Sequence, residues 1–274
     1  MRINHTLQLL REGKSTVGTW IQIHSVRMTR MLAAQGCADW LLLDCEHGAV
    51  ELPTLMAEIS AINDISRGRV TPIVRVAAGT IDQIKQALDC GAHGVLVPMV
   101  NTPEEAAAVV SYARFPPAGQ RGNGSTLAHV NYGASKSEYI TQINDHVLVA
   151  IQIETREAVE NVEQILSVPG IDMVFVGPFD LTFSLGITPG FWSDSPIFQD
   201  ALQAVMSACR RRGIPVGTFC ADAKMAKERE AYGFRFMSLS ADVPLLLSAL
   251  GQQYGEFQNE AEPPEGWAGR LRLE

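Results

Sequence analysis

Two carboxylates follow two neighbouring apolar runs of this chain. Glu154 comes directly after "HVLVAIQI" (146–153), and Asp180 follows "IDMVFVG" (171–177). If these runs are adjacent parallel strands, the two carboxylates lie close together, and their repulsion requires a shared proton or a cation. Oxygen ligands without a neighbouring His or Cys favour a hard divalent ion, Mg²⁺ or Mn²⁺. The sequence therefore predicts a metal site at Glu154 and Asp180; the alternatives are a proton-sharing carboxylate pair, or Asp180 as an ordinary helix N-cap.

Other polar side chains also fall at the ends of apolar runs: Asp44, Glu46 and His47 after the second run, Arg75 at the third, and Gln152 in the fifth. His47 titrates near neutrality when unperturbed, so it is the candidate general base, with Asp44 placed to orient it. A metal at +2, two acids at −2 and Arg75 at +1 leave one positive charge, which fits a monoanionic keto acid. For each residue the alternative is a helix cap or a surface ion pair.

Eight β-rich apolar runs recur along the chain, at 16–23, 39–45, 70–76, 94–100, 146–153, 171–177, 214–219 and 234–240. Most are continuous rather than alternating, which is typical of parallel strands covered on both faces. Helix-forming stretches separate them; one begins with Thr102, Pro103 and Glu105 as a capping box. The pattern predicts a closed (β/α)8 barrel, whose chemistry sits at the carboxyl ends of the strands. An open doubly wound sheet is the alternative, but no G-x-G-x-x-G follows the first run.

Composition limits the function classes. The 274 residues carry a net charge of −8, which disfavours nucleic-acid and anionic-membrane partners. Five scattered cysteines without a CxxC pair predict reduced thiols in the cytoplasm and no zinc–sulfur site. We expect one domain over 1–274, with a C-terminal tail from about residue 255. Two long connections, 115–145 and 184–199, are expected to be functional or mobile.

Several of these motifs together are similar to a known family. "DCEHG", "PIVRV", "ARFPPAGQRGNG", "VAIQIETREAVENV" and "VFVGPFDL" resemble the class II (metal-dependent) pyruvate aldolases of the 4-hydroxy-2-oxoheptanedioate and 2-keto-3-deoxy-sugar-acid aldolase type, from about residue 15 to 250. The resemblance implies a (β/α)8 barrel of the phosphoenolpyruvate/pyruvate-binding type, in a homo-hexamer with the last helix exchanged between subunits. It implies reversible cleavage of a 4-hydroxy-2-oxo acid to pyruvate and an aldehyde. The intermediate would be a pyruvate enolate held by Mg²⁺, Mn²⁺ or Co²⁺.

The resemblance also implies roles for individual residues. Glu154 and Asp180 would be the metal ligands, Arg75 would bind and polarise the keto acid, Gln152 would lie near pyruvate, His47 would be the base with Asp44 beside it, and Asp89 would reach the catalytic His of a neighbouring subunit. Three positions depart from the family pattern. Phe179 replaces a small residue whose N–H faces the pyruvate carboxylate, Phe219 replaces an aliphatic residue near the aldehyde, and His129 replaces a frequent Arg. The aldehyde is therefore not implied.

Other functions would use some of the same residues. A citrate-lyase-like or malyl-CoA-lyase-like enzyme would use the same acids, but the sequence lacks a basic cluster for the phosphates of CoA. A decarboxylating enzyme of the macrophomate-synthase kind would use the same enolate to form a different bond. The non-enzymatic alternative is a keto-acid-binding regulatory barrel. No predicted strand ends on a Lys, so a Schiff-base aldolase is disfavoured.

Overall fold

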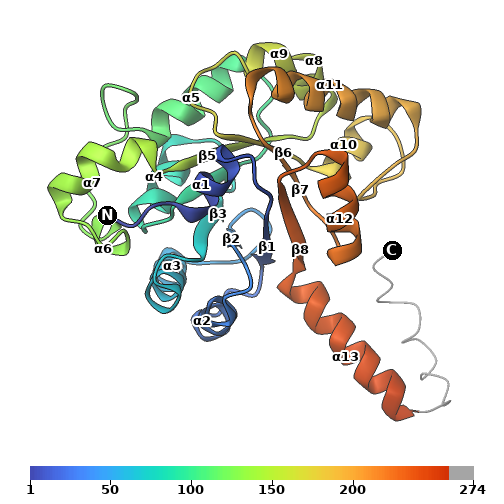
Figure 1. Ribbon diagram of the computed structural model, residues 1–274, viewed down its shortest axis with the longest axis horizontal. Helices are drawn as coiled ribbons and strands as arrows, with labels where there is room; N and C mark the ends of the chain where they lie inside the picture. Colours follow the sequence, from blue (N-terminus) through green and yellow to red (C-terminus); the bar gives the residue numbers. More distant parts are fainter. Residues whose placement is uncertain (259–274) are drawn as a thin grey trace.

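The computed structural model describes residues 1–258, and its centre is a closed barrel of eight parallel strands in sequence order (Figure 1). Each predicted apolar run contains or overlaps one strand, so the (β/α)8 prediction is confirmed. The strands are β1 (Thr16–Ile21), β2 (Trp40–Asp44), β3 (Thr71–Arg75), β4 (Gly94–Val97), β5 (Leu148–Ile153), β6 (Met173–Val176), β7 (Val216–Thr218) and β8 (Phe236–Ala241).

Helices follow the strands and cover the outside of the barrel (Figure 1). They are α1 (His5–Arg11), α2 (Val26–Gln35), α3 (Leu52–Ser66), α4 (Ile81–Asp89), α5 (Pro103–Ala113), α6 (Ala128–Asn131), α7 (Lys136–Gln142), the 3₁₀ turn η1 (Ile143–Asp145), α8 (Arg156–Glu160), α9 (Val162–Ile165), α10 (Pro178–Ser184), α11 (Pro196–Arg212), α12 (Ala223–Tyr232) and α13 (Asp242–Gln258). The predicted capping box of Thr102 and Glu105 begins α5.

Large side chains fill the inside of the barrel and leave one end for chemistry. Trp40 and Phe236 stack there with ring centroids 4.0 Å apart. Leu7 and Leu10 of α1 belong to the same core. Because α1 packs where strands begin, through hydrogen bonds such as Asn4 Nδ2 to the carbonyl of His93, it closes the amino ends of the strands. The carboxyl ends remain open as the rim predicted for the site.

The two long connections lie at opposite ends of the barrel. Residues 115–145 contain α6, α7 and η1 and lead from α5 into the start of β5, so they cover the end remote from the rim. Tyr132 of this connection is fully buried and stacks on His93 at 3.8 Å. Residues 184–199 instead follow β6 and α10 on the rim side.

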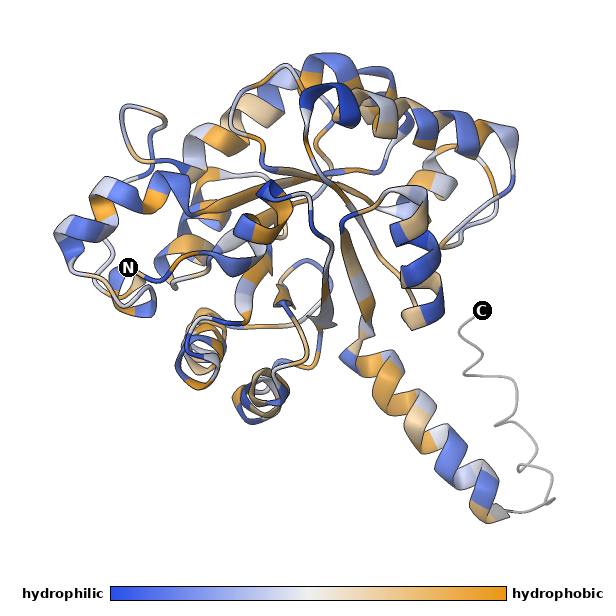
Figure 2. Cartoon of the chain, viewed as in Figure 1, coloured by the Kyte–Doolittle hydropathy of each residue, from blue (hydrophilic) through white to orange (hydrophobic). Residues whose placement is uncertain are grey.

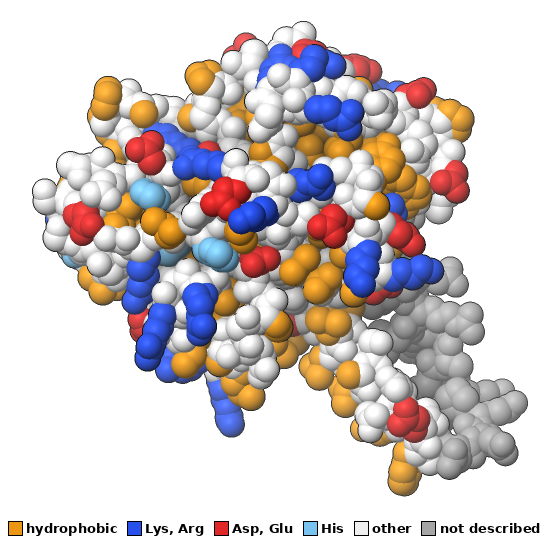
Figure 3. All heavy atoms as spheres, in the orientation of Figure 1, with side chains coloured by type: hydrophobic (Ala, Val, Ile, Leu, Met, Phe, Trp, Pro, Cys, Tyr) orange, Lys and Arg blue, Asp and Glu red, His pale blue; other side chains and the backbone are white. Residues whose placement is uncertain are grey.

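The last helix, α13, extends away from the rest of the chain (Figure 1). Its exposed apolar side chains, here called the stripe, are Leu245, Leu246, Leu247, Leu250, Tyr254 and Phe257. The ribbon of this helix is largely orange over its first half in Figure 2, and orange atoms lie along it in Figure 3. At its root, the buried Asp242 carboxylate accepts the N–H groups of Gln22 and Ile23, at 2.9 and 3.0 Å. The predicted tail from about residue 255 is helical as far as Gln258, and its remainder lies outside the described residues. None of the helices in residues 1–258 has the length and apolarity needed to cross a bilayer.

Candidate active site

Asp44 and Arg75 form a buried ion pair where β2 and β3 end. The strand register places the two residues side by side. Arg75 donates from Nε to Asp44 Oδ1 at 2.9 Å and from Nη2 to Oδ2 at 2.7 Å. Burial acts to raise the pKa of Asp44, but the hydrogen bonds and charge of Arg75 outweigh it and hold that pKa below its usual value. Arg75 Nη1 also lies 2.9 Å from Glu46 Oε2, so one guanidinium connects both acids.

His47 stands at the edge of this pair, with its side chain 62% exposed. Asp44 was expected to orient the imidazole; in the described residues it contacts the backbone of the His47 loop, and its role toward the ring stays a prediction. Asp44 Oδ1 accepts the backbone N–H groups of Glu46 and His47, at 3.2 and 3.3 Å, because its carboxylate already faces Arg75. The nearest acid to the ring is Glu46, with Oε2 3.9 Å from Nε2. Asp44 therefore fixes the backbone of the loop and leaves the ring free.

Glu154 follows β5 and is buried at the same rim. Its Oε1 accepts the N–H of Met99 at 2.8 Å, and its Oε2 accepts Nε2 of Gln152 at 2.5 Å. Met99 has a φ of 56°, an uncommon backbone conformation for a non-glycine residue that aims its N–H at the acid. Gly177 leaves the necessary space, since a Cβ there would lie 2.4 Å from Glu154 Oε2.

Asp180 lies in the first turn of α10, which begins directly after β6. The N-cap of this helix is Gly177, so the reading of Asp180 as an ordinary N-cap is wrong. The carboxylate is exposed, and the positive end of the helix dipole favours its charge. Burial and the charges of Asp180 and Glu46 raise the pKa of Glu154 to about 7, against the hydrogen bonds from Met99 and Gln152.

These carboxylates suit a hard divalent cation. Burial also raises the pKa of Glu46, although Arg75 opposes it. The charges of Glu46 and Asp180 both act on Glu154. A cation between Glu154 and Asp180 would offset those charges through oxygen ligands alone. Residues 1–258 hold no group of three or more His, Cys, Asp or Glu side chains arranged for a metal.

A second buried ion pair lies behind the His47 loop and was missed from the sequence. His24 Nδ1 lies 2.9 Å from Glu58 Oε2, and His24 Nε2 lies 3.0 Å from the carbonyl oxygen of Asp44. Burial acts to lower the pKa of His24, but the hydrogen bonds and charges of Glu58 and Asp44 raise it overall. A Cβ at Gly48 would lie 2.6 Å from His24 Nε2, so the glycine permits this contact. The sequence signal that could have indicated this pair was a polar residue, His24, directly after the apolar run 16–23.

Aromatic side chains occupy the remaining part of the rim. Trp20 of β1 lies under Arg75, whose Cζ is 4.2 Å from its ring centroid. Phe219 follows β7, and its ring centroid lies 5.9 Å from that of Trp20. Phe179, the residue before Asp180, is 38% exposed. Both sequence-predicted phenylalanines therefore lie at the rim.

Asp89 ends α4 and lies away from this rim. Its Oδ1 lies 3.0 Å from Nη2 of Arg121, whose side chain is fully buried. Arg121 also lies over the ring of Phe115, at 4.8 Å. Asp89 thus neutralises a buried cation within its own chain.

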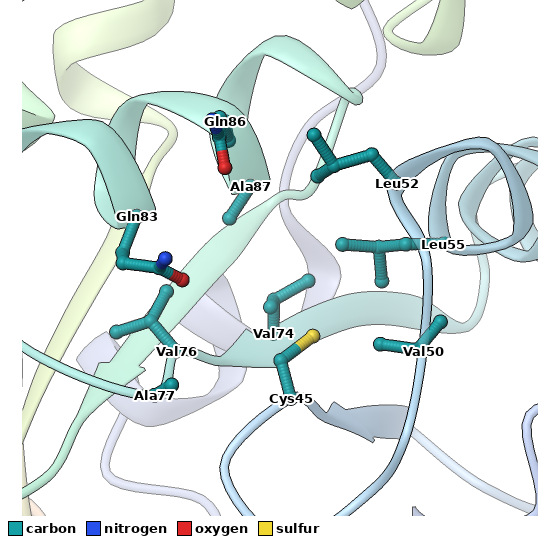
Figure 4. A pocket seen from close by; sticks show the side chains of 10 residues that line it. All are labelled: Cys45, Val50, Leu52, Leu55, Val74, Val76, Ala77, Gln83, Gln86 and Ala87. Carbon is teal, nitrogen blue, oxygen red and sulfur yellow. The ribbon is translucent and has the colours of Figure 1, made fainter.

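One cavity lies beside the rim rather than over it. Its volume is about 260 Å³, and it opens between α3 and α4 against β3 (Figure 4). Aliphatic side chains line it, with Gln83, Gln86 and the Cys45 thiol. Burial raises the pKa of Cys45 to about 12, which leaves the thiol unreactive near neutrality. The rim itself carries the charged groups, so we place the chemistry there.

Comparison with known proteins agrees with this geometry. Residues 16–249 match the family model described as HpcH/HpaI aldolase/citrate lyase. A 4-hydroxy-2-oxo-heptane-1,7-dioate aldolase of Klebsiella pneumoniae subsp. pneumoniae is 39% identical over 252 residues, 92% of this chain and 93% of that protein. A 2-keto-3-deoxy-L-rhamnonate aldolase of the same bacterium is 35% identical over 256 residues, 93% of this chain and 94% of that protein.

A solved structure of a family protein from Burkholderia cenocepacia J2315 has a TM-score of 0.85 at 33% identity. The match covers 93% of this chain and 99% of that chain. These matches confirm the resemblance stated from the motifs. The chain therefore belongs to the HpcH/HpaI aldolase/citrate lyase family, whose aldolase members are carbon–carbon lyases.

Proposed function

We propose that this rim reversibly cleaves a 4-hydroxy-2-oxo acid into pyruvate and an aldehyde, with a divalent metal held by Glu154 and Asp180. The observation that carries the proposal is the burial of Glu154 near the charges of Asp180 and Glu46, which together raise its pKa to about 7, while Glu46 pairs with Arg75 at 2.9 Å. Crowded acids next to a fixed guanidinium suit a cation together with an anionic keto acid.

The proposed reaction divides the work among this chain's residues. His47 takes the proton of the C4 hydroxyl, the C3–C4 bond breaks, and its electron pair moves into pyruvate enolate. Arg75 uses the N–H groups not committed to Asp44 to bind the keto acid, and Gln152, held against Glu154 at 2.5 Å, lies beside it. A divalent ion supplies charge stabilisation where the oxygen becomes negative. A proton added at C3 completes pyruvate.

We also propose that the chain works as a homo-oligomer, a hexamer by family resemblance. The support is α13, whose leucine-rich stripe is exposed on the single chain. An exposed apolar stripe of this kind usually marks an interaction surface. A second copy that receives α13 would bury it, as exchange of the last helix between subunits requires.

Pyruvate release from several 4-hydroxy-2-oxo acids tests the proposed activity. We expect release to stop in excess EDTA and to return with Mg²⁺, Mn²⁺ or Co²⁺. Borohydride should trap no pyruvate on the protein. Full activity in EDTA, or a borohydride-stable adduct, would contradict the proposal and indicate a Schiff-base mechanism.

A further inference from the structure

Four aromatic side chains form a continuous row along one side of the rim, here called the aromatic wall: the buried Trp20, then Phe219, Phe191 and Phe179, which reach solvent. The ring centroids of Trp20 and Phe219 are 5.9 Å apart, and those of Phe219 and Phe191 are 5.1 Å apart in a stacked arrangement. Phe191 and Phe179 meet edge to face at 4.7 Å. Each separation lies in the range of favourable aromatic pairs.

The aromatic wall begins and ends at groups assigned to the keto acid. At one end, Arg75 lies over Trp20 at 4.2 Å. At the other end, Phe179 immediately precedes Asp180. A substrate whose keto-acid end lies between Arg75 and Asp180 would therefore extend its other end along the wall. That other end is the part released as the aldehyde.

The loop that carries Phe191 is held rigidly by its neighbour. Trp192 packs under the guanidinium of Arg229, with Cζ 3.6 Å from the ring centroid, and its ring contacts Tyr232 at 5.4 Å. The N–H of Gly190 also donates to Thr182 Oγ1 at 3.1 Å. Phe191 is consequently in place before substrate arrives, and a surface formed in advance loses little entropy on binding.

The wall is partly open to solvent and apolar. Phe179 is 38% exposed, while Phe191 and Phe219 are half-buried. Among the cation–ring contacts in residues 1–258, none falls on Phe179, Phe191 or Phe219. The rings themselves offer a carboxylate or several hydroxyls no hydrogen bond in exchange for lost water. An aromatic ring would gain both burial and edge-to-face contact.

We infer that the aldehyde half of this site accepts an arylaldehyde, so that the substrate is a 4-aryl-4-hydroxy-2-oxobutanoate. This inference rests on the proposed function. In cleavage, the C4 hydroxyl loses its proton and becomes the carbonyl of the arylaldehyde. The C3–C4 bond breaks, its electron pair goes to pyruvate enolate, and C3 takes up a proton. The step involves no net oxidation and needs no further reactant.

Aldol addition of pyruvate to three aldehydes, in the presence of Mg²⁺ or Mn²⁺, tests the inference. Benzaldehyde represents the aryl class, succinic semialdehyde the carboxylated class and lactaldehyde the hydroxylated class. We expect kcat/KM for benzaldehyde to exceed the other two by roughly 10- to 100-fold, the discrimination available from burying one ring. An equal or higher kcat/KM for either polar aldehyde would overturn the inference.

Single-residue variants test whether the preference for benzaldehyde arises from the aromatic wall. Phe191→Ala should lower the ratio of benzaldehyde to lactaldehyde kcat/KM by about 10-fold, and the milder Phe191→Leu should lower it less. Phe183→Ala is the matched control, because Phe183 lies on α10 but is 73% exposed and has no partner among the aromatic pairs of residues 1–258. An unchanged ratio in both folded Phe191 variants would also overturn the inference.

A separate measurement distinguishes failure of this inference from failure of the proposed function. Exchange of the pyruvate methyl protons with D₂O requires the enolate but no aldehyde. Exchange together with a preference for a polar aldehyde would leave the aldolase proposal standing and reject the aryl assignment. No exchange and no addition with any aldehyde would reject both.

Discussion

At the scale of single residues, the imidazole of His47 is separate from the buried groups behind it. Its side chain is 62% exposed, and Asp44 contacts its backbone N–H rather than its ring. Removal of the ring should therefore change chemistry and leave folding almost unaffected. This separation makes His47 the cleanest residue at which to test general base catalysis.

We predict that His47→Ala lowers kcat for cleavage by roughly 10²- to 10⁴-fold, the usual contribution of a general base. KM and the melting temperature should change little. Arg75→Ala should impair both KM and kcat, and it should also destabilise the fold, because it leaves Asp44 as a buried unpaired carboxylate. Steady-state kinetics and thermal unfolding check both variants. Near-normal turnover in His47→Ala would assign the base to another group.

His24 carries a prediction about pH. A raised folded-state pKa means that protonated His24 adds stability, which is fully present below its unfolded pKa of about 6.5 and is lost as the pH rises through the folded pKa. His24→Gln should therefore reduce the urea midpoint more at pH 6 than at pH 9. Its kcat should also fall, because Asp44 and the His47 loop lose their support.

The matched control is His5→Gln, since His5 is 41% exposed and lies 4.0 Å from Asp39 at the other end of the barrel. We expect no comparable loss in this variant. A destabilisation by His24→Gln that is the same at both pH values would show that the charge of His24 contributes nothing. The remaining role would then be packing alone.

At the scale of elements, the strands were predictable because each is a continuous apolar run. The carboxyl ends of adjacent parallel strands meet, so Glu154, Asp180 and Arg75 were predictable as one cluster as well. The His24–Glu58 pair was not, since it joins residues 34 apart through tertiary packing. Phe191 was missed because it lies in a loop without a helical or strand period. The short helices of connection 115–145 were also missed, since its Gly and Pro residues obscure them.

Asp89 shows how two roles can overlap at the end of one helix. Within its own chain it neutralises the buried Arg121, and family resemblance assigns it to the His47 of a neighbouring subunit. Asp89→Asn alone cannot separate these roles, because it also leaves a buried cation unpaired. Such a cation destabilises a fold by about 3–5 kcal/mol.

We predict that Asp89→Asn lowers both the melting temperature and kcat. Adding Arg121→Met removes the unpaired cation and should restore much of the melting temperature without restoring kcat. Mixing Asp89→Asn with His47→Ala subunits should regain part of the activity, since some interfaces then hold both native residues. Full recovery of kcat in the double variant would restrict Asp89 to its structural role.

At the scale of the whole molecule, α13 is linked to the rim through a short series of contacts. Its first residue, Asp242, binds the backbone of Gln22, whose side chain donates to Asp44 Oδ2 at 3.1 Å. The contacts therefore lead from the Asp44–Arg75 ion pair through Gln22 to Asp242, where α13 begins. Burial of α13 in another subunit should therefore reduce the mobility of α13 and of the Asp44–Arg75 ion pair.

We predict that Leu246→Glu combined with Leu250→Glu reduces the solution mass from a multiple of 29.8 kDa to that of one chain. Charges on the stripe cannot be buried without a partner. Gln253→Glu adds a charge at an exposed polar position of the same helix and should leave the mass unchanged. Light scattering after size-exclusion chromatography checks this. A single-chain mass for the unaltered protein would contradict the oligomer proposal.

The most direct test of the central claim, a metal-dependent pyruvate enolate at Glu154 and Asp180, is exchange of the pyruvate methyl protons with D₂O followed by NMR. The measurement needs no knowledge of the aldehyde. Metal-depleted protein should show no exchange above the solution rate, and Mg²⁺ or Mn²⁺ should restore exchange to the native protein but not to Glu154→Gln. Rapid exchange in excess EDTA, or native-like exchange by Glu154→Gln, would contradict the claim.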